Sequence, residues 1–169
     1  RTVLVQRSSE PHWVVKQGLA KLRVEVDWFA DPARVHREGV ALRWLHDRLP
    51  QGVVPAVVLG GFERRLLAIE CAPLPHDNWK SLLLAEPIDL ALVDQFATNL
   101  ASIHRLGCDP RDPAPDELRD KGLFESLRLE PYYGYAARQR PAASEFLRSL
   151  MAEARARDDT VVHGDYSPK

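Results

Sequence analysis

Lys16 is the first residue in the chain whose type and setting suggest chemistry. It stands in the short, largely apolar run Trp13-Val-Val-Lys-Gln17, which is typical of a β-strand. A lysine in such a strand either points to solvent or binds a fixed anion. Taken alone, the solvent-facing arrangement is the more frequent one. Lys16 therefore gains a functional meaning only if a second charged residue holds it in place.

Glu38 lies on the apolar side of a predicted helix. At roughly 100° per residue, the side chains inside a stripe of about 80° are Val35, Glu38, Leu42, Leu45 and Leu49. A carboxylate on this core-facing side is costly unless a cation pairs with it. Lys16, on a nearby strand, is the natural partner. The other arrangement, in which Glu38 bends from the edge of the stripe into water, stays open.

The sequence His163-Gly164-Asp165 opens a polar loop that Pro168 keeps non-helical. A carboxylate on such a loop can accept the proton of a substrate hydroxyl, and His163 would then brace the loop by hydrogen bonds rather than react. A plain turn with a hydrogen-bonded histidine explains the same three residues. The triplet alone does not decide between these interpretations.

Other kinds of catalytic site fit the sequence less well. A metal site on His163, Asp165 and either His104 or His76 has no compact ligand spacing. The Gly-x-Ser-x-Gly sequence of a serine hydrolase is absent, as is the phosphate loop Gly-x-x-x-x-Gly-Lys-Ser/Thr. A carboxylate that acts on a hydroxyl is therefore favoured.

Periodic patterns predict the elements that must position these residues. The predicted strands are residues 1–7, 12–17, 54–60, 66–71 and 160–163, the first two forming a hairpin. The predicted helices are residues 31–49, 79–86, 89–106, 123–130 and 142–157. Asp31 and Pro32 are expected to start the first of them, Gly107 to end the third, and Pro131 and Pro141 to break the last two. Strands first and helices later predict an α+β fold.

Composition and charge narrow the class of protein. The 169 residues carry 23 Lys+Arg against 24 Asp+Glu, a formal net charge of −1, which argues against a general nucleic-acid-binding protein. No run reaches the roughly 20 apolar residues of a membrane span, and no leader pattern is present. Cys71 and Cys108 form no CxxC pair and are expected to be free thiols in a reducing compartment. We therefore expect a cytoplasmic protein without nucleic-acid or membrane partners.

The order of strand Lys16, helix Glu38 and loop Asp165 resembles the protein-kinase-like fold, with a β-rich N-terminal lobe and a helical C-terminal lobe. The catalytic loop of that fold reads His-x-Asp, four further residues and an Asn. Residues 163–169 match all of it except the Asn, which would be the next residue. The resemblance covers nearly the whole chain.

Details of the loop resemble one branch of this fold, the aminoglycoside phosphotransferases and choline kinases. Gly164 replaces the usual Arg, and Ser167 stands where protein kinases carry Lys. The sequence Ala101-Ser-Ile-His-Arg-Leu106 is also typical of this branch. The resemblance therefore implies that the acceptor is a small-molecule hydroxyl rather than a protein side chain.

The resemblance implies an ATP-dependent kinase and a role for each site residue. Lys16 would bind the α- and β-phosphates, and Glu38 would hold Lys16 in place. Asp165 would orient the acceptor hydroxyl and help to deprotonate it, and Lys169 is close enough in sequence to contribute. The residues expected around adenine are Ile69, packed near the base, and Glu70, Cys71 and Ala72, which would offer backbone hydrogen bonds.

The resemblance also implies boundaries. Residues 1–72 would be a partial nucleotide-binding lobe, residues 73–78 a hinge linker and residues 79–169 a partial helical lobe. The chain is expected to be truncated at both ends. The phosphate-covering hairpin loop would lie at or before its start, and the Mg²⁺ ligands, the Asn and a later Asp, would follow Lys169. The fragment alone is therefore expected to be inactive and to hold no metal ligand.

The acceptor pocket is less clear in the sequence. The aromatic-rich residues 124–135 could line it, with Arg128 or the tyrosines contacting substrate, but helix packing and a surface turn explain this segment equally well, and Trp79 has the same two explanations. The acidic residues that would favour a cationic acceptor, such as an aminoglycoside or choline, are Glu125, Glu130, Asp116 and Glu117. Residues 15–23 and Trp28 are instead similar to methylthioribose kinases, which phosphorylate a sugar hydroxyl.

Two rival functions remain. A non-catalytic nucleotide- or ligand-binding protein could keep the same fold, although the joint presence of Lys16, Glu38 and Asp165 favours a kinase. A protein kinase is disfavoured by Gly164 and Ser167. The acceptor, the choice between ATP and GTP, and the oligomeric state are not encoded in any motif of the sequence.

Overall fold

Four strands form one antiparallel sheet in the first part of the chain. The structure, a computed structural model, describes residues 1–9, 11–22, 24–25, 27–61, 65–85 and 87–168. The strands are β1 (Thr2–Val5), β2 (Trp13–Gln17), β3 (Val57–Gly61) and β4 (Leu66–Glu70), in the spatial order β1-β2-β4-β3. The predicted hairpin of the first two strands is confirmed, and the other two predicted strands are present with slightly different bounds.

The rest of the chain is helical. The helices are α1 (Arg34–His46), α2 (Trp79–Leu84), α3 (Leu90–Gly107), the 3₁₀ turn η1 (Asp116–Leu118), α4 (Gly122–Phe124), the π-helical segment η2 (Glu125–Gly134), α5 (Tyr135–Gln139) and α6 (Pro141–Ala156). No described residue after β4 lies in a strand. The predicted α+β fold, with a β-rich first part and a helical second part, is confirmed.

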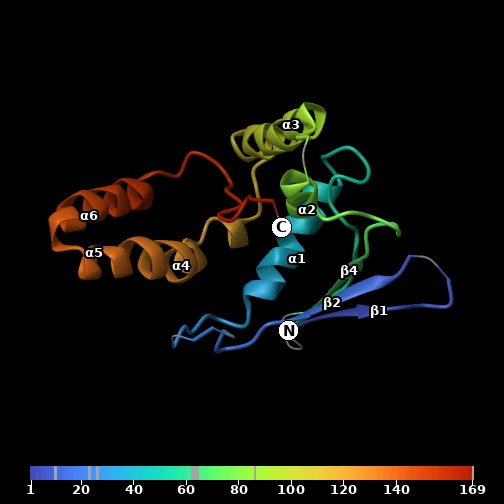
Figure 1. Ribbon diagram of the computed structural model, residues 1–169, viewed down its shortest axis with the longest axis horizontal. Coiled ribbons are helices and arrows are strands. Elements are labelled where there is room, and N and C mark those ends of the chain that lie inside the picture. The colour runs from blue at the N-terminus through green and yellow to red at the C-terminus, as the bar shows by residue number, and fades with distance from the viewer. Residues whose placement is uncertain (10, 23, 26, 62–64, 86, 169) are drawn as a thin grey trace.

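One face of the sheet packs against α1. Val35 of α1 forms a buried cluster with Leu67 and Ile69 of β4, and the partly buried Val14 of β2 packs against it. Lys16 pairs with Leu67 across the sheet, so its side chain belongs to this same face. In Figure 1, α1 stands between the sheet and the α4–α6 segment. The helix that carries Glu38 is therefore stacked directly on the strand face that carries Lys16.

A second buried cluster attaches the other end of α1 to the helical part of the chain. Its members are Trp44 and Leu45 in the second half of α1, Leu49 just after this helix, Ile103 of α3 and Ala114 of the loop that follows α3. Since the two clusters lie on successive turns of α1, this helix is the shared support of the sheet and of α3. The predicted apolar stripe of α1 agrees with this burial.

The first helix starts later than the sequence predicts. Asp31 was expected to cap it and Pro32 to begin it, but α1 begins at Arg34. The Asp31 carboxylate does cap backbone, because its Oδ1 accepts a hydrogen bond from the N–H of Ala33 at 2.8 Å. Residues 32 and 33 form a turn, so the Asp31 carboxylate binds an N–H of this turn rather than one of α1.

Pro131 does not break its helix as predicted. It lies inside η2, a π-helical segment of ten residues. In a π-helix the N–H of residue 131 would bond to the carbonyl of Ser126, five residues earlier. Proline has no N–H, so that carbonyl is left without its helical donor. The indole Nε1 of Trp28 donates to it at 3.2 Å, and this long-range bond compensates for the proline. Pro141, by contrast, separates α5 from α6 as expected and begins α6.

The predicted strand at residues 160–163 is absent. Its β-branched residues favour extended backbone, but a strand needs a neighbouring strand for its hydrogen bonds. The segment instead lies along the end of α3, where the Thr160 hydroxyl donates to the His104 carbonyl at 2.7 Å. Gly107 makes this approach possible, because a Cβ there would lie 2.3 Å from Thr160 Oγ1.

Cys71 and Cys108 are both free thiols, as expected. The Cys108 thiol donates to the carbonyl of Asp159 at 3.2 Å. Across the described residues, none of the helices has the length and apolar character required to span a lipid bilayer.

Candidate active site

Lys16 and Glu38 meet where the sheet contacts α1. Lys16 Nζ donates to Glu38 Oε1 at 2.5 Å, with the two side chains 31% and 38% exposed. Val35 and Leu42, on the same side of α1, pack into the cluster around Leu67. The ion pair therefore sits at the edge of the apolar cluster, where solvent or a ligand can reach it. Of the two arrangements that the sequence left open for Glu38, the structure adopts the paired one.

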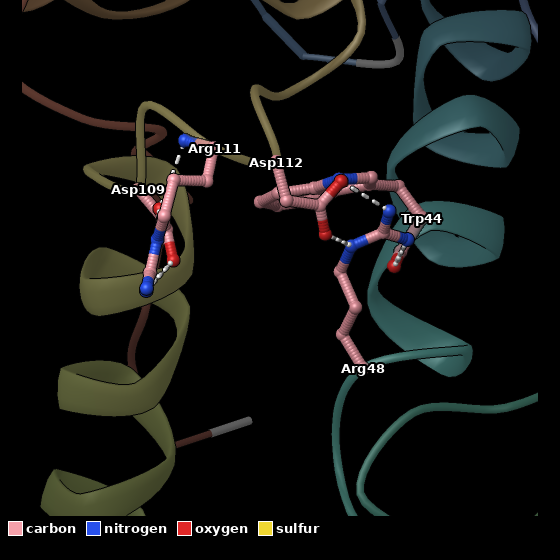
Figure 2. A network of polar contacts seen from close by, with 5 residues as sticks. All are labelled: Trp44, Arg48, Asp109, Arg111 and Asp112. Atoms are coloured by element: carbon pink, nitrogen blue, oxygen red, sulfur yellow. Dashed lines mark hydrogen bonds and ion pairs between the residues drawn. The ribbon is translucent and has the colours of Figure 1, made fainter.

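A loop that follows α3 holds the C-terminal end of α1. Arg48 makes a two-point contact with Asp112, its Nε donating to Oδ2 at 2.6 Å and its Nη2 to Oδ1 at 2.8 Å. Its Nη1 also donates to the carbonyl of Trp44 at 2.9 Å. Figure 2 shows Arg48 reaching from the end of α1 to Asp112 beside the Trp44 ring. This arrangement resists rotation of α1 about its axis.

The same loop contains a second, local pair. The Arg111 guanidinium and backbone N–H both donate to the Asp109 carboxylate (Figure 2) and lower the pKa of Asp109 to about 2. The hydrogen bond from Arg48 lowers the pKa of Asp112 and, reciprocally, raises that of Arg48. Both carboxylates are therefore ionised at neutral pH and keep the loop attached to its arginines.

The end of β4 has both used and unused backbone groups. The N–H of Glu70 donates to the carbonyl of Ala56 at 2.9 Å, and the N–H of Cys71 donates to the carbonyl of His12 at 2.8 Å. Those two donors hold the end of β4 to the neighbouring segments, so the N–H of Cys71 is already engaged within the protein. Among the described residues, no backbone hydrogen bond from outside the strand ladders engages the carbonyl of Glu70 or the N–H of Ala72. Ile69 is buried against α1, on the strand face that also carries Lys16.

Asp165 lies on the C-terminal segment beside Arg128 of η2. Arg128 Nη2 is 3.2 Å from Asp165 Oδ2, with the two side chains 27% and 41% exposed. The N–H of Asp165 donates to His163 Nδ1 at 3.2 Å, which is the bracing role expected of that histidine. Gly164 has a φ of +72°, a conformation that favours glycine. This turn immediately precedes Asp165, whose carboxylate contacts Arg128.

An aromatic stack fixes the residue after Asp165. The Tyr166 ring stacks on Phe96 of α3 at 3.9 Å between centroids, and Phe96 contacts Trp79 of α2 at 4.4 Å. The Tyr166 hydroxyl donates to the carbonyl of Phe96 at 2.8 Å, and burial raises the pKa of this hydroxyl. Trp79 thus packs against the ring on which Tyr166 stacks.

The aromatic-rich segment proposed for the acceptor corresponds mainly to η2. Its tyrosines Tyr132 and Tyr133 are exposed. Its acidic residues are paired with arginines: Glu125 with Arg155 at 2.5 Å, and Glu130 with Arg138 at 3.0 Å. The hydrogen bond from Arg155 lowers the pKa of Glu125. The negative charges of η2 are therefore neutralised at short range.

The described part of the chain holds no group of three or more His, Cys, Asp or Glu side chains suited to a metal ion. This part includes His163, Asp165, His104 and His76. Lys169, considered as a contributor to catalysis, lies outside the described residues.

Comparison with known proteins decides the family. A model of the phosphotransferase enzyme family (APH) matches residues 1–169, the whole chain. This chain belongs to that family. The resemblance to aminoglycoside phosphotransferases and choline kinases is thereby confirmed at the level of the family. No curated protein and no solved structure matches this phosphotransferase-family chain significantly, so no individual relative supplies an acceptor or a ligand geometry.

Several residues around the site of this phosphotransferase-family chain were missed by sequence reasoning. Arg37, Arg48 and Asp120 form ion pairs that fix α1, yet they are polar residues on helix or loop surfaces without any distinguishing spacing. Arg128 was named only as a possible substrate contact. The one available signal was Pro131, because a proline inside a helical pattern indicates that an unsatisfied carbonyl needs another donor.

Proposed function

We propose that the full-length protein is an ATP-dependent phosphotransferase that moves the γ-phosphoryl group of ATP to a hydroxyl of a small molecule. The observation that carries this proposal is the Lys16–Glu38 ion pair, in which Nζ and Oε1 are 2.5 Å apart. The pair joins a strand to a helix in a chain of the phosphotransferase family. A lysine held in this way presents a fixed positive charge to phosphate oxygens. Its partial exposure leaves room for such a ligand.

The nucleotide would bind between the sheet face that carries Lys16 and the end of β4. Lys16 binds the α- and β-phosphates, and Glu38 keeps it from turning to solvent. The carbonyl of Glu70 accepts a hydrogen bond from the adenine amino group, and the N–H of Ala72 donates to a ring nitrogen. This assignment is supported by the absence, among the described residues, of backbone hydrogen bonds to these two groups from outside the strand ladders. Ile69 packs behind the base, and residues 73–78 form the hinge between residues 1–72 and 79–169.

Asp165 would act on the acceptor. One oxygen of its carboxylate accepts the hydrogen bond of the acceptor hydroxyl and aims that oxygen at the γ-phosphorus. The new bond forms between the hydroxyl oxygen and phosphorus while the bond from phosphorus to the β–γ bridging oxygen breaks. ADP leaves, and the hydroxyl proton passes to Asp165. Because the transferred group spreads its charge over three oxygens, position and positive charge contribute most of the rate.

Mg²⁺ is the metal that enzymes of this family generally use together with ATP, and it would neutralise charge on the β- and γ-phosphates. The described side chains do not form a site for it. The expected ligands are the Asn and the later Asp that the resemblance places after Lys169.

The charges around η2 favour a neutral, sugar-like acceptor over a positively charged one. An aminoglycoside or choline-like acceptor needs carboxylates that are not already paired. Glu125 and Glu130 are each paired with an arginine, and the Asp165 carboxylate faces Arg128. A neutral polyol needs only hydrogen-bonding groups, which this surface supplies in Tyr132 and Tyr133. An ATP-using enzyme of this kind would act in the cytoplasm.

The test is transfer of labelled γ-phosphate by the full-length protein to a panel of sugars, small alcohols, choline and aminoglycosides. We expect label on a sugar hydroxyl and no label on an analogue of the same sugar that lacks this hydroxyl. Binding of Mg-ATP without phosphorylation of any acceptor would instead support the alternative, a non-catalytic nucleotide-binding protein of the same family.

A further inference from the structure

Arg128 is held in a fixed orientation next to Asp165. Its Nη2 lies 3.2 Å from Asp165 Oδ2, and its Nη1 donates to the carbonyl of Leu127 at 3.1 Å. The guanidinium group is planar, so a bond from one of its nitrogens to the backbone restricts the direction in which the other points. This contact sets the direction of the Asp165 carboxylate relative to η2.

The backbone turn at Gly164, next to Asp165, lies against Arg128. A Cβ on Gly164 would lie 3.6 Å from Arg128 Nε and 3.7 Å from its Cγ, with Phe124 at 4.0 Å. These are ordinary contact distances, so glycine is required here by its φ of +72° rather than by lack of room. The turn at Gly164 thus brings Asp165 onto the side of η2 where Arg128 projects.

The start of this helical segment is bound to α1. Arg37 of α1 donates from Nη2 to Asp120 Oδ2 at 2.5 Å and from Nη1 to the Asp120 carbonyl at 2.9 Å. Asp120 Oδ1 accepts the N–H of Gly122, the first residue of α4, at 2.8 Å. That N–H and the Arg37 guanidinium together lower the pKa of Asp120. Asp120 therefore binds the first N–H of α4, which continues into the η2 segment that carries Arg128, and attaches it to Arg37, the residue before Glu38.

A second attachment comes from the segment before α1. Trp28 donates from Nε1 to the carbonyl of Ser126 at 3.2 Å, and its ring meets Tyr132 edge-on at 5.9 Å between centroids. The Ser126 carbonyl is free for this bond because Pro131 cannot donate to it. Two attachments, one at its start and one along its length, fix η2 relative to the N-terminal part of the chain.

We propose that Arg128 is a positioning residue for Asp165, and that η2, attached through Arg37–Asp120 and Trp28, holds this pair in register with α1 and the Lys16–Glu38 pair. Through this contact Arg128 fixes the orientation of the carboxylate that acts on the acceptor hydroxyl. The inference rests on the proposed function for the meaning of Asp165. The contacts that carry it are independent of any substrate.

The kinetic test uses Arg128→Ala, Arg128→Lys and the matched control Arg157→Ala in the full-length protein. Arg157 also pairs with a carboxylate, Glu153, but on the exposed end of α6. For Arg128→Ala we expect kcat to fall about 100-fold, the order expected of a misplaced catalytic group, with little change in the KM for ATP. Added guanidinium chloride, well below unfolding concentrations, should restore part of kcat in Arg128→Ala only, and Arg128→Lys should keep an intermediate kcat. Equal kcat in Arg128→Ala and Arg157→Ala would overturn the proposal.

A second measurement does not depend on turnover. Amide hydrogen exchange of residues 163–166 should become faster in Arg128→Ala, and by a smaller factor in Asp120→Asn, but not in Arg157→Ala. Unchanged exchange in Arg128→Ala would show that Arg128 does not hold the loop. If the wild-type protein transfers no phosphate, the proposed function fails, while the exchange result still decides whether Arg128 positions Asp165.

Discussion

Lys16 and Glu38 show how a partly exposed ion pair can be worth more to function than to stability. With each side chain about a third exposed, their attraction is screened by water and contributes little to folding. The apolar cluster beside them fixes where the two charges stand, so the pair is ready before any ligand arrives. Its value lies in the direction of the ammonium group, which a free lysine on a strand would not maintain.

Replacement of Lys16 by methionine tests this role directly. Lys16→Met keeps the length of the side chain and removes its charge. We expect kcat/KM for ATP to fall by about 100-fold or more, the scale of losing one fixed charge opposite developing negative charge. Glu38→Gln should cause a smaller loss, because Lys16 remains but is no longer held. Steady-state kinetics measures both, and Lys80→Met, on the exposed side of α2, serves as the control. A Lys16→Met enzyme with wild-type kinetics would remove Lys16 from the site.

At the scale of elements, α1 connects the parts of the chain. Its first half packs on the sheet, and its second half packs on Ile103 of α3 and is held by Arg48–Asp112. The sequence predicted the burial pattern, because an apolar stripe at helical spacing specifies which side faces inward. It did not predict Arg48–Asp112 or Arg37–Asp120, because a surface arginine can pair with any carboxylate that the fold happens to bring near.

The Arg48–Asp112 contact should make stability depend on pH. The pKa of Asp112 is lowered in the folded state, so the folded form binds its proton less readily than the unfolded form. The stabilisation is fully present above the ordinary pKa of aspartate, about 4, and is lost as pH falls below that value. In urea unfolding at several pH values, Asp112→Asn should be less stable than wild type at pH 6, and the difference should shrink as the pH is lowered through 4 to 3. A constant difference would contradict this explanation.

The contact between α3 and the segment after α6 depends on Gly107. Replacement by alanine would place a Cβ 2.3 Å from Thr160 Oγ1 and 2.6 Å from the Val161 nitrogen. Although alanine favours a helix, we expect Gly107→Ala to lower the free energy of unfolding by about 1–3 kcal/mol, as overpacking does. Gly61→Ala is the control, because no atom of the described residues lies within 4 Å of a Cβ placed there. Thermal unfolding that shows Gly107→Ala as stable as Gly61→Ala would exclude a close contact.

Two errors of sequence reasoning in this region have a common physical cause. Residues 160–163 have strand propensity, and Pro131 has a helix-breaking tendency, but both are local properties. The first was overridden because no neighbouring strand is available, and the second because Trp28, distant in sequence, supplies a donor to the Ser126 carbonyl. Long-range partners decided both outcomes, and a single sequence does not specify them.

At the scale of the whole molecule, the N-terminal sheet and the C-terminal loop are joined through the helices between them. Lys16 contacts Glu38 on α1, and Arg37 on the same helix contacts Asp120. Asp120 binds the N–H of Gly122 at the start of the helical segment in which Arg128 contacts Asp165. The identities of Lys16, Glu38 and Asp165 as the chemically important residues came from their types and order in the sequence. The connections between them came only from the three-dimensional arrangement.

The most direct test of this account is the effect of Asp165→Asn on phosphoryl transfer by the full-length protein. The substitution keeps the shape of the side chain and removes its capacity to accept a proton. At saturating ATP and acceptor, we predict that kcat falls about 100- to 10,000-fold, the usual contribution of a general base, while the dissociation constant of Mg-ATP is unchanged. Asp158→Asn, an exposed carboxylate on the same segment, should behave as wild type. A kcat of Asp165→Asn equal to that of Asp158→Asn would contradict the assignment of Asp165 and, with it, the proposed mechanism.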